Sequence, residues 1–146
     1  MQRVARAKAV HGWQIVRWRK LLRQPLLAAD TTLELDGEII GKPRDAVDAL
    51  RILRCLSGRT HQVLTAVCVV QEERQETVLS RSEVRFVRLD DAEIRRYIDS
   101  GEPMDKAGAY GIQGRAAAFI AHLAGSYSGV MGLPLHETVV LLKRFA

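Results

Sequence analysis

HQVLTAVCVVQ, residues 61–71, is the stretch of the sequence that decides the fold. Its residues are apolar or β-branched on both faces, which is typical of a strand at the centre of a sheet. The stretch that follows, ETVLSRSEVRFV at 76–87, alternates polar and apolar residues and is expected to pair beside it. These two stretches predict a sheet with a buried middle.

Helices and a hairpin are predicted on the amino-terminal side of this strand. A helix over 45–57 presents one apolar face and ends at Gly58, a typical position for a helix stop. Asp36-Gly37, between alternating residues, predicts a type I′ hairpin because both turn positions need positive φ. Before it, the apolar run 26–29 suits a short buried strand that ends at Asp30. Residues 2–20 suit a helix that Pro25 stops.

The carboxyl-terminal side is predicted to contain two more helices. Asp90 and Glu93 have the spacing of a capping box, which begins a helix that ends near Gly101. Residues 101–115 form a glycine-rich polar loop, and periodicity does not decide between helix and strand for 115–125. Pro134 then opens an amphipathic helix. We therefore expect one α/β domain over residues 1–146.

The composition is that of an ordinary globular protein, with 47% hydrophobic and 27% charged residues, and it contains no apolar run long enough to cross a bilayer. The amino terminus lacks the apolar core of a secretory signal. Its basic composition without acidic residues leaves a transit peptide as an alternative. Cys55 and Cys68 lack metal-ligand spacing, so we interpret them as buried free thiols in a reducing compartment. A cytoplasmic location without membrane partners is the resulting expectation.

The net charge of +5 is concentrated at the amino terminus. Residues 1–24 contain seven basic side chains and no acidic one: Arg3, Arg6, Lys8, Arg17, Arg19, Lys20 and Arg23. Such a segment can bind phosphates, from nucleic acid to a single nucleotide. The alternative is a solvated helix face.

Polar and charged groups gather in three places that follow apolar elements: Asp30-Thr31 with Lys42, residues 58–61, and residues 102–114. Carboxylates bind divalent metals or accept protons, lysines neutralise phosphate, and glycines let backbone N–H groups approach an anion. Together these suit hydrolysis of a phosphoanhydride. Each has a structural alternative, since Asp30 could cap a turn, Lys42 could be solvated, Gln113 could be a structural amide and His61 a packed histidine.

Read together, the blocks resemble a known family. ADTTLELDGEIIGKPRDAVDALRILRCLSGRTHQVLTAV, then SEVRFVRLDDAEIRRYIDSGEPMDKAGAYGIQG and SYSGVMGLPLHET, resemble the ordered motifs of the Maf family over nearly the whole chain. VARAKA resembles the helix that precedes the ADT strand. The resemblance implies a Maf/inosine-triphosphatase-like mixed twisted sheet flanked by helices. It also implies hydrolysis of nucleoside triphosphates between the α and β phosphates, with Mg²⁺ or Mn²⁺.

The resemblance also implies residue roles. Asp30 of ADT would be the general base or metal-linked carboxylate, and Lys8 and Lys42 would contact phosphate oxygens. Thr31 and Gln113 fall at positions linked to nucleobase choice. Asp105 and Lys106 would shape the same pocket. DKAGAYGIQG resembles the branch that acts on dTTP and UTP, whereas the branch that acts on 7-methyl-GTP has a different loop.

One part of the family pattern is missing: the first strand and the Ser-x-Ser-Pro-Arg-Arg loop that contacts phosphate. Three explanations stay open, namely a misassigned start or fragment, a paralogue without activity, or replacement by the arginines at 17, 19 and 23. An unpaired edge is then expected, which a homodimer would partly cover. Two other functions stay open: an inactive nucleotide- or nucleic-acid-binding protein, and a regulator of cell division. Nucleic acid is not the expected substrate.

Overall fold

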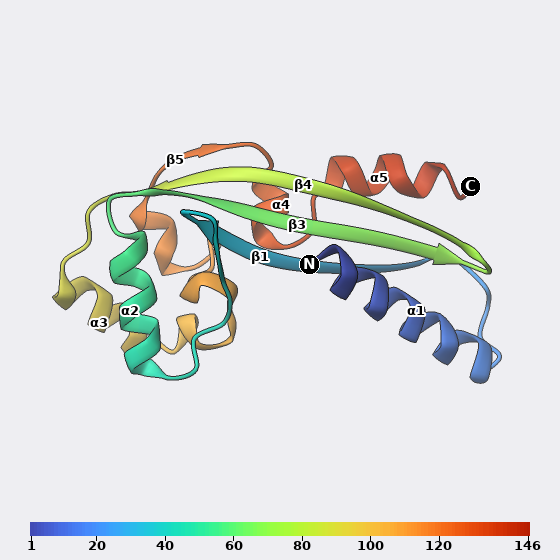
Figure 1. Ribbon diagram of the computed structural model, residues 1–146, viewed down its shortest axis with the longest axis horizontal. Coiled ribbons are helices and arrows are strands. Elements are labelled where there is room, and N and C mark those ends of the chain that lie inside the picture. The colour runs from blue at the N-terminus through green and yellow to red at the C-terminus, as the bar shows by residue number, and fades with distance from the viewer.

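The computed structural model describes residues 1–146 and confirms the α/β class (Figure 1). The strands are β1 (Leu26–Leu35), β2 (Glu38–Ile40), β3 (Thr60–Gln71), β4 (Arg74–Phe86) and β5 (Ile120–Ala124). The α-helices are α1 (Gln2–Trp18), α2 (Ala46–Leu56), α3 (Asp91–Asp99), α4 (Tyr127–Met131) and α5 (Leu135–Lys143). Three short 3₁₀ segments lie between α3 and β5: η1 (Glu102–Asp105), η2 (Ala107–Ala109) and η3 (Arg115–Phe119).

The five strands form one sheet in the order β2-β1-β3-β4-β5, with the predicted β3 at its centre. All four pairings are antiparallel, so the sheet is antiparallel throughout and not mixed as expected. Tight turns explain two of these pairings, because Asp36-Gly37 joins β1 to β2 and Glu72-Glu73 joins β3 to β4. Antiparallel neighbours need only such short connections.

Three local predictions are confirmed. Asp36 and Gly37 have φ values of 53° and 81°, as a type I′ turn requires. Asp90 and Glu93 make both hydrogen bonds of a capping box at the start of α3. Pro134 immediately precedes α5, where its missing N–H costs nothing.

Helices cover both faces of the sheet. Ala5, Ala9 and Trp13 of α1 pack on a small cluster that includes Ala66 and Cys68 of β3. Because successive side chains of a strand point to opposite faces, Val67 and Val69 lie on the other face, where they pack on Leu141 and Phe145 of the α5 region. Figure 1 shows α1 and α5 on opposite sides of the same end of the strands.

The largest core lies at the opposite end of the strands, under α2 and α3 (Figure 1). It contains Leu33 and Val63 from the sheet, Leu53 from α2 and Ile94 from α3, all nearly inaccessible to solvent. The polypeptide between α3 and β5 folds back against this core through Ala109 and Tyr110. This packing carries the glycine-rich segment to the edge of the sheet face that contains Leu33.

Two boundaries differ from those expected. The first strand continues to Leu35 and does not end after Ala29, so Asp30 lies within β1 and not at its carboxyl end. The reason is alternation: Leu33 and Leu35 extend the buried face, while Glu34 between them is partly exposed. The 115–125 stretch, which periodicity left undecided, is 3₁₀ helix up to Phe119 and strand from Ile120.

Both cysteines are free, as expected, but only Cys68 is buried. Cys55 is exposed because it lies on the side of α2 away from Ile52, Leu53 and Leu56, which face the core. The prediction of two buried thiols is therefore wrong for Cys55.

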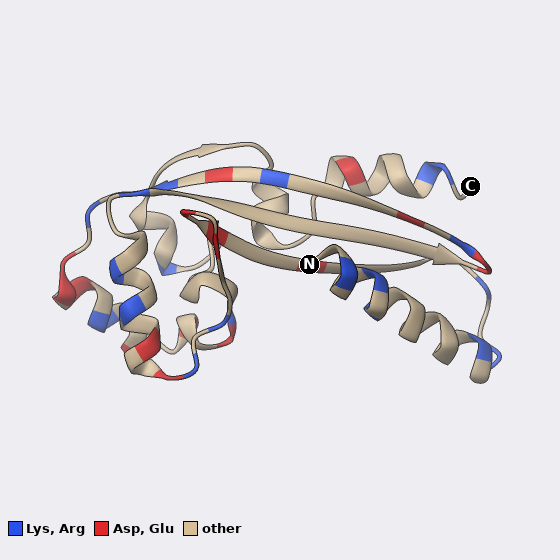
Figure 2. Ribbon diagram, viewed as in Figure 1, with Lys and Arg blue, Asp and Glu red and all other residues tan.

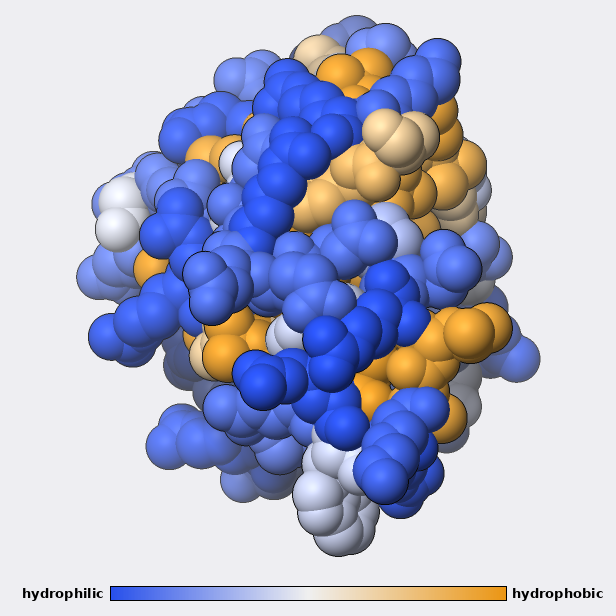
Figure 3. All heavy atoms as spheres, turned by 90° about the vertical axis from the view of Figure 1, so that its right-hand side faces the viewer, coloured by the Kyte–Doolittle hydropathy of each residue, from blue (hydrophilic) through white to orange (hydrophobic).

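Lys and Arg side chains are distributed along α1, which contains no Asp or Glu (Figure 2). The end of the molecule formed by the β3–β4 turn and the carboxyl-terminal helix is mostly hydrophilic, with separate hydrophobic areas between the polar side chains (Figure 3). No helix is both long enough and apolar enough to cross a bilayer.

Candidate functional site

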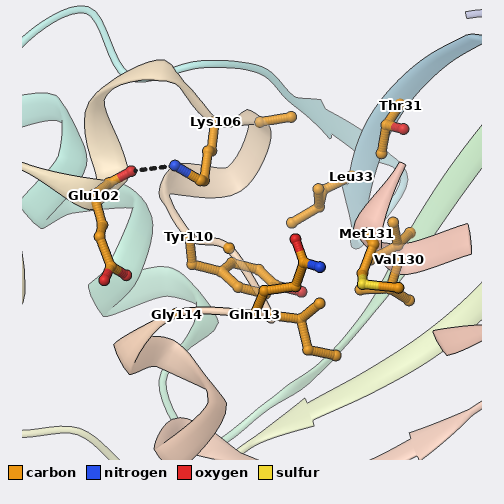
Figure 4. A pocket seen from close by; sticks show the side chains of 13 residues that line it. Thr31, Leu33, Glu102, Lys106, Tyr110, Gln113, Gly114, Val130 and Met131 are labelled. Carbon is orange, nitrogen blue, oxygen red and sulfur yellow. Dashed lines mark hydrogen bonds between the residues drawn. The ribbon is translucent and has the colours of Figure 1, made fainter. Parts of the chain in front are cut away.

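A pocket of about 440 Å³ opens between β1, the glycine-rich segment and α4. Its volume falls in the range typical of small-molecule sites. Figure 4 shows Lys106 and Glu102 on one side, Tyr110 and Gln113 in the middle, and Val130 and Met131 of α4 opposite. The lining also includes Thr31, Leu33, Val63, Ala107, Gly111, Ile112 and Gly114. An apolar wall with a few polar groups is therefore present.

Thr31, Lys106 and Gln113, which the sequence singled out in two separate segments, all line this pocket. The Thr31 hydroxyl lies 2.9 Å from the hydroxyl of Thr65, which donates to the Gly129 carbonyl at 2.8 Å. Thr65 is almost fully buried. This chain of hydrogen bonds joins β1 and β3 to α4, so it fixes the wall that contains Thr31.

Lys106 is held by its own segment. Its Nζ donates to the Glu102 carbonyl at 3.0 Å and to Asp105 Oδ1 at 2.9 Å. The hydrogen bond from Lys106 is the main cause that lowers the pKa of the Asp105 carboxyl, and the charge of Lys42 adds to it. Asp105 and Lys42 therefore lie near each other, but both are outside the pocket lining.

A buried aromatic cluster supports the pocket. His61 Nε2 lies 2.6 Å from the Tyr110 hydroxyl, and both rings meet Phe86 edge to face. Burial lowers the pKa of His61 to about 4 and raises the pKa of the Tyr110 phenol above its usual range. Both groups are therefore neutral at pH 7, and the interpretation of His61 as a packed, hydrogen-bonded histidine is confirmed.

Gly108 allows the glycine-rich segment to approach β1 closely. Its φ is +74°, and a Cβ atom at this position would lie 2.1 Å from Leu33 Cδ2. Its N–H donates to the Gly41 carbonyl at 3.0 Å. Only glycine satisfies both the backbone conformation and the contact with the pocket residue Leu33.

Asp30 and Lys8 form a second polar group, on the other face of β1. Lys8 Nζ donates to Asp30 Oδ1 at 2.9 Å and to the Ala29 carbonyl at 3.3 Å. Asp30 precedes Thr31, so the alternation of the strand points its side chain away from the pocket and toward α1. The structure therefore brings Asp30 and Lys8 together but does not place them in the pocket.

The strand edge between these two groups is unpaired. On the side away from β3, β2 pairs with β1 only from Leu33 to Leu35. At Asp30 and Thr31 that side of β1 has no neighbouring strand. No cluster of three or more His, Cys, Asp or Glu side chains in metal-binding arrangement occurs.

Comparison with known proteins identifies the family. A model of the family described as "Maf-like protein" matches residues 1–145. The chain belongs to the Maf family. This membership explains the order of its ADT, GKP, LSGRTH and GIQG motifs.

Several Maf relatives carry the name dTTP/UTP pyrophosphatase. The protein of that name from Dechloromonas aromatica (strain RCB) is 65% identical over 144 residues, which cover 99% of this chain and 72% of the relative. Those from Aromatoleum aromaticum and Chromobacterium violaceum are 59% and 57% identical, and each aligns with 99% of this chain and with 70% and 73% of its own length.

Several residues at the pocket received no individual role from the sequence. Glu102, Tyr110 and Met131 line it, and Tyr97 contacts its loop from α3. Glu102 and Tyr110 lie in the glycine-rich cluster, and Met131 lies in the SYSGVMGLPLHET block, so their position in a motif was the available signal. Tyr97 is recognisable only from the tertiary contact.

Proposed function

We propose that this protein hydrolyses nucleoside triphosphates, dTTP and UTP in particular, to the monophosphate and pyrophosphate. The observation that carries the proposal is the convergence of Thr31, Lys106 and Gln113 on one pocket of about 440 Å³. The names of the Maf relatives support the same nucleotides.

The pocket suits a pyrimidine base. The Gln113 side-chain amide offers both a donor and an acceptor, which complements the imide N–H and carbonyl of uracil and thymine. Cytosine lacks the imide N–H, so one hydrogen bond would be lost. Leu33, Val130 and Met131 supply apolar contacts for the ring.

The phosphates would cross the unpaired edge of β1 and reach Asp30. We assign Asp30 as general base: it accepts a proton from the water whose oxygen attacks the α-phosphorus, while the bond from that phosphorus to the bridging oxygen breaks. Pyrophosphate is the leaving group. Lys8, at 2.9 Å from Asp30, and Lys42 would offset phosphate charge.

A divalent metal ion fits this donor set. Mg²⁺ is commonly held by one or two protein carboxylates together with substrate phosphates and water, and Asp30 supplies one carboxylate. When bound, such an ion neutralises charge on the triphosphate and on the leaving group. Lys8 now occupies one oxygen of that carboxylate, so its ammonium would move toward the phosphates.

The same ion pair favours a second candidate function, a nucleotide-binding protein without catalysis. In that case Lys8 would stay paired with Asp30, and the basic side chains of α1 would bind phosphate. A cytoplasmic location and a homodimer stay predictions.

Pyrophosphate release by the purified chain tests the proposal. The panel is dTTP, UTP, CTP, GTP and 7-methyl-GTP, each with Mg²⁺ or Mn²⁺. We expect release from dTTP and UTP above the other nucleotides. Saturable, salt-sensitive nucleotide binding without any pyrophosphate would support the non-catalytic candidate instead.

A further inference from the structure

The loop that contains Gln113 is held at both ends by side chains from other segments. At one end, the Gly111 N–H donates to the Tyr97 hydroxyl oxygen of α3 at 3.2 Å. At the other end, the Arg115 N–H donates to the two carboxylate oxygens of Glu102 at 3.3 and 3.1 Å. Gln113 lies midway between these two attachments.

Tyr97 and Glu102 together make the unit that holds the two ends of the loop. Tyr97 is 2% exposed, and its ring meets that of Phe119 edge to face. Burial is the main cause that raises the pKa of the Tyr97 phenol to about 12, and the nearby Glu102 carboxylate adds to it. The phenol therefore stays neutral and can accept from the loop while it donates elsewhere.

The loop backbone packs directly on this unit. A Cβ atom on Gly114 would lie 2.3 Å from a Glu102 carboxylate oxygen, so a larger residue here would displace the Glu102 side chain. A Cβ atom on Gly111 would lie 2.8 Å from Cε of Lys106, the residue whose ammonium binds the Glu102 carbonyl. The loop thus contacts Glu102 at Gly114 and Lys106 at Gly111. Figure 4 shows Glu102 and Lys106 on one side of Gln113.

We propose that Tyr97 and Glu102 act as a clamp that fixes the 111–115 loop, aims Gln113 into the nucleobase pocket and so sets nucleotide selectivity. The inference rests on the proposed function. Both are positioning residues, because they act on the nucleotide through the loop backbone and not by contact with the reacting atoms. Hydrogen bonds to both loop ends, one part-buried at Gly111 and one exposed at Arg115, restrict its conformations before substrate arrives.

The first test compares Glu102→Ala with Glu102→Gln, in assays of kcat/KM for dTTP and CTP. Without the acceptor for Arg115 N–H, Glu102→Ala should lower the dTTP-to-CTP ratio about tenfold, mainly through KM for dTTP, as expected for one misplaced hydrogen bond. Glu102→Gln should keep the ratio within about twofold, since its amide oxygen accepts the same N–H.

Glu93→Ala is the matched control. Glu93 also accepts a backbone N–H, that of Asp90 at 3.1 Å, but it is outside the pocket. The Glu93→Ala variant should keep the dTTP-to-CTP ratio of kcat/KM found in the parent protein. Tyr97→Phe keeps the ring and removes only the hydroxyl, so it tests the clamp independently if Glu102→Ala fails to fold.

Backbone hydrogen exchange separates this inference from the proposed function, because it needs no turnover. Glu102→Ala should speed exchange of the 111–115 amides at least about tenfold, and Glu93→Ala should not. Unchanged exchange in Glu102→Ala would overturn the clamp even in an inactive protein. An unchanged ratio in a folded Glu102→Ala would also overturn it, as would loss of the ratio in Glu102→Gln, which would instead indicate direct contact between the carboxylate and substrate.

Discussion

The two sides of β1 differ in how completely they are built. On the Thr31 side, hydrogen bonds among buried groups join the strand to α4, and aromatic rings support Tyr110 beneath the pocket. On the Asp30 side, one ion pair with side chains 51% and 23% exposed faces solvent beside α1. The first side holds a fixed shape, whereas the second offers charge that a ligand can rearrange.

This difference matches the two tasks of the proposed reaction. Selectivity between bases depends on small differences in hydrogen bonding, so it needs groups that are already in place. Phosphate chemistry depends on charge, and Lys8 and Asp30 supply opposite charges within 2.9 Å. The pocket side should therefore tolerate little change in structure, while the Asp30 side should tolerate substitution in folding but not in turnover.

The largest expected effect comes from Asp30→Asn. We expect kcat for dTTP to fall about 10³-fold, because an amide cannot accept the proton that a general base removes. The free energy of unfolding should change by less than about 1 kcal/mol, since exposed ion pairs contribute little. Pyrophosphate release and urea unfolding measure the two quantities.

Asp36→Asn is the matched control, because it makes the same change at an exposed position in the hairpin turn that follows β1. It should keep the parent kcat. If Asp30→Asn hydrolysed dTTP at the parent rate, the role assigned to Asp30 would be wrong and the non-catalytic candidate would gain support.

Local rules predicted much of the fold. The Asp36-Gly37 turn, the Asp90 capping box and Pro134 before α5 depend on neighbouring residues, which the sequence displays directly. The position of Asp30 within β1 was harder to predict from the sequence. After four apolar residues, Asp-Thr-Thr resembles a strand end, and only the pairing of Asp30 with Ala66 of β3 shows that the strand continues.

The site was predictable in part for the same reason. Thr31, Lys106 and Gln113 lie in recognisable motifs, and the fold brings them to one pocket. Lys42 lies outside that lining, so its contact with phosphate stays a prediction. The support from Tyr97 was beyond sequence patterns, since it depends on how α3 packs against the 111–115 loop.

A second, smaller effect concerns the pH dependence of stability on the pocket side. The pKa of His61 is about 4 in the folded protein and near 6.5 when the chain is unfolded, so the unfolded state binds more protons between these values. Stability should be fully present above pH 6.5 and should fall as the pH drops toward 4. The loss is roughly 3 kcal/mol, measurable by urea unfolding at each pH.

His61→Gln isolates this contribution. The variant should be less stable at pH 7, because it leaves the Tyr110 hydroxyl without its histidine partner, but its stability should fall less steeply between pH 6.5 and 4.5. His122→Gln removes an exposed histidine and should follow the parent profile. Parallel slopes for His61→Gln and the parent would place the acid sensitivity outside the aromatic cluster.

The smallest expected effect on stability comes from Lys8→Ala, which removes the other half of the exposed pair. Unfolding free energy should change by less than about 1 kcal/mol, whereas KM for dTTP should rise about tenfold because one phosphate contact is lost. Arg17→Ala removes a charge from an exposed position in the last turn of α1 without a side-chain contact to Asp30, so it controls for net charge. A stability loss above about 2 kcal/mol in Lys8→Ala would mean that the ion pair holds α1 to the sheet. The two sides of β1 would then both be structural, and the charge beside Asp30 could not rearrange for substrate without loosening the fold.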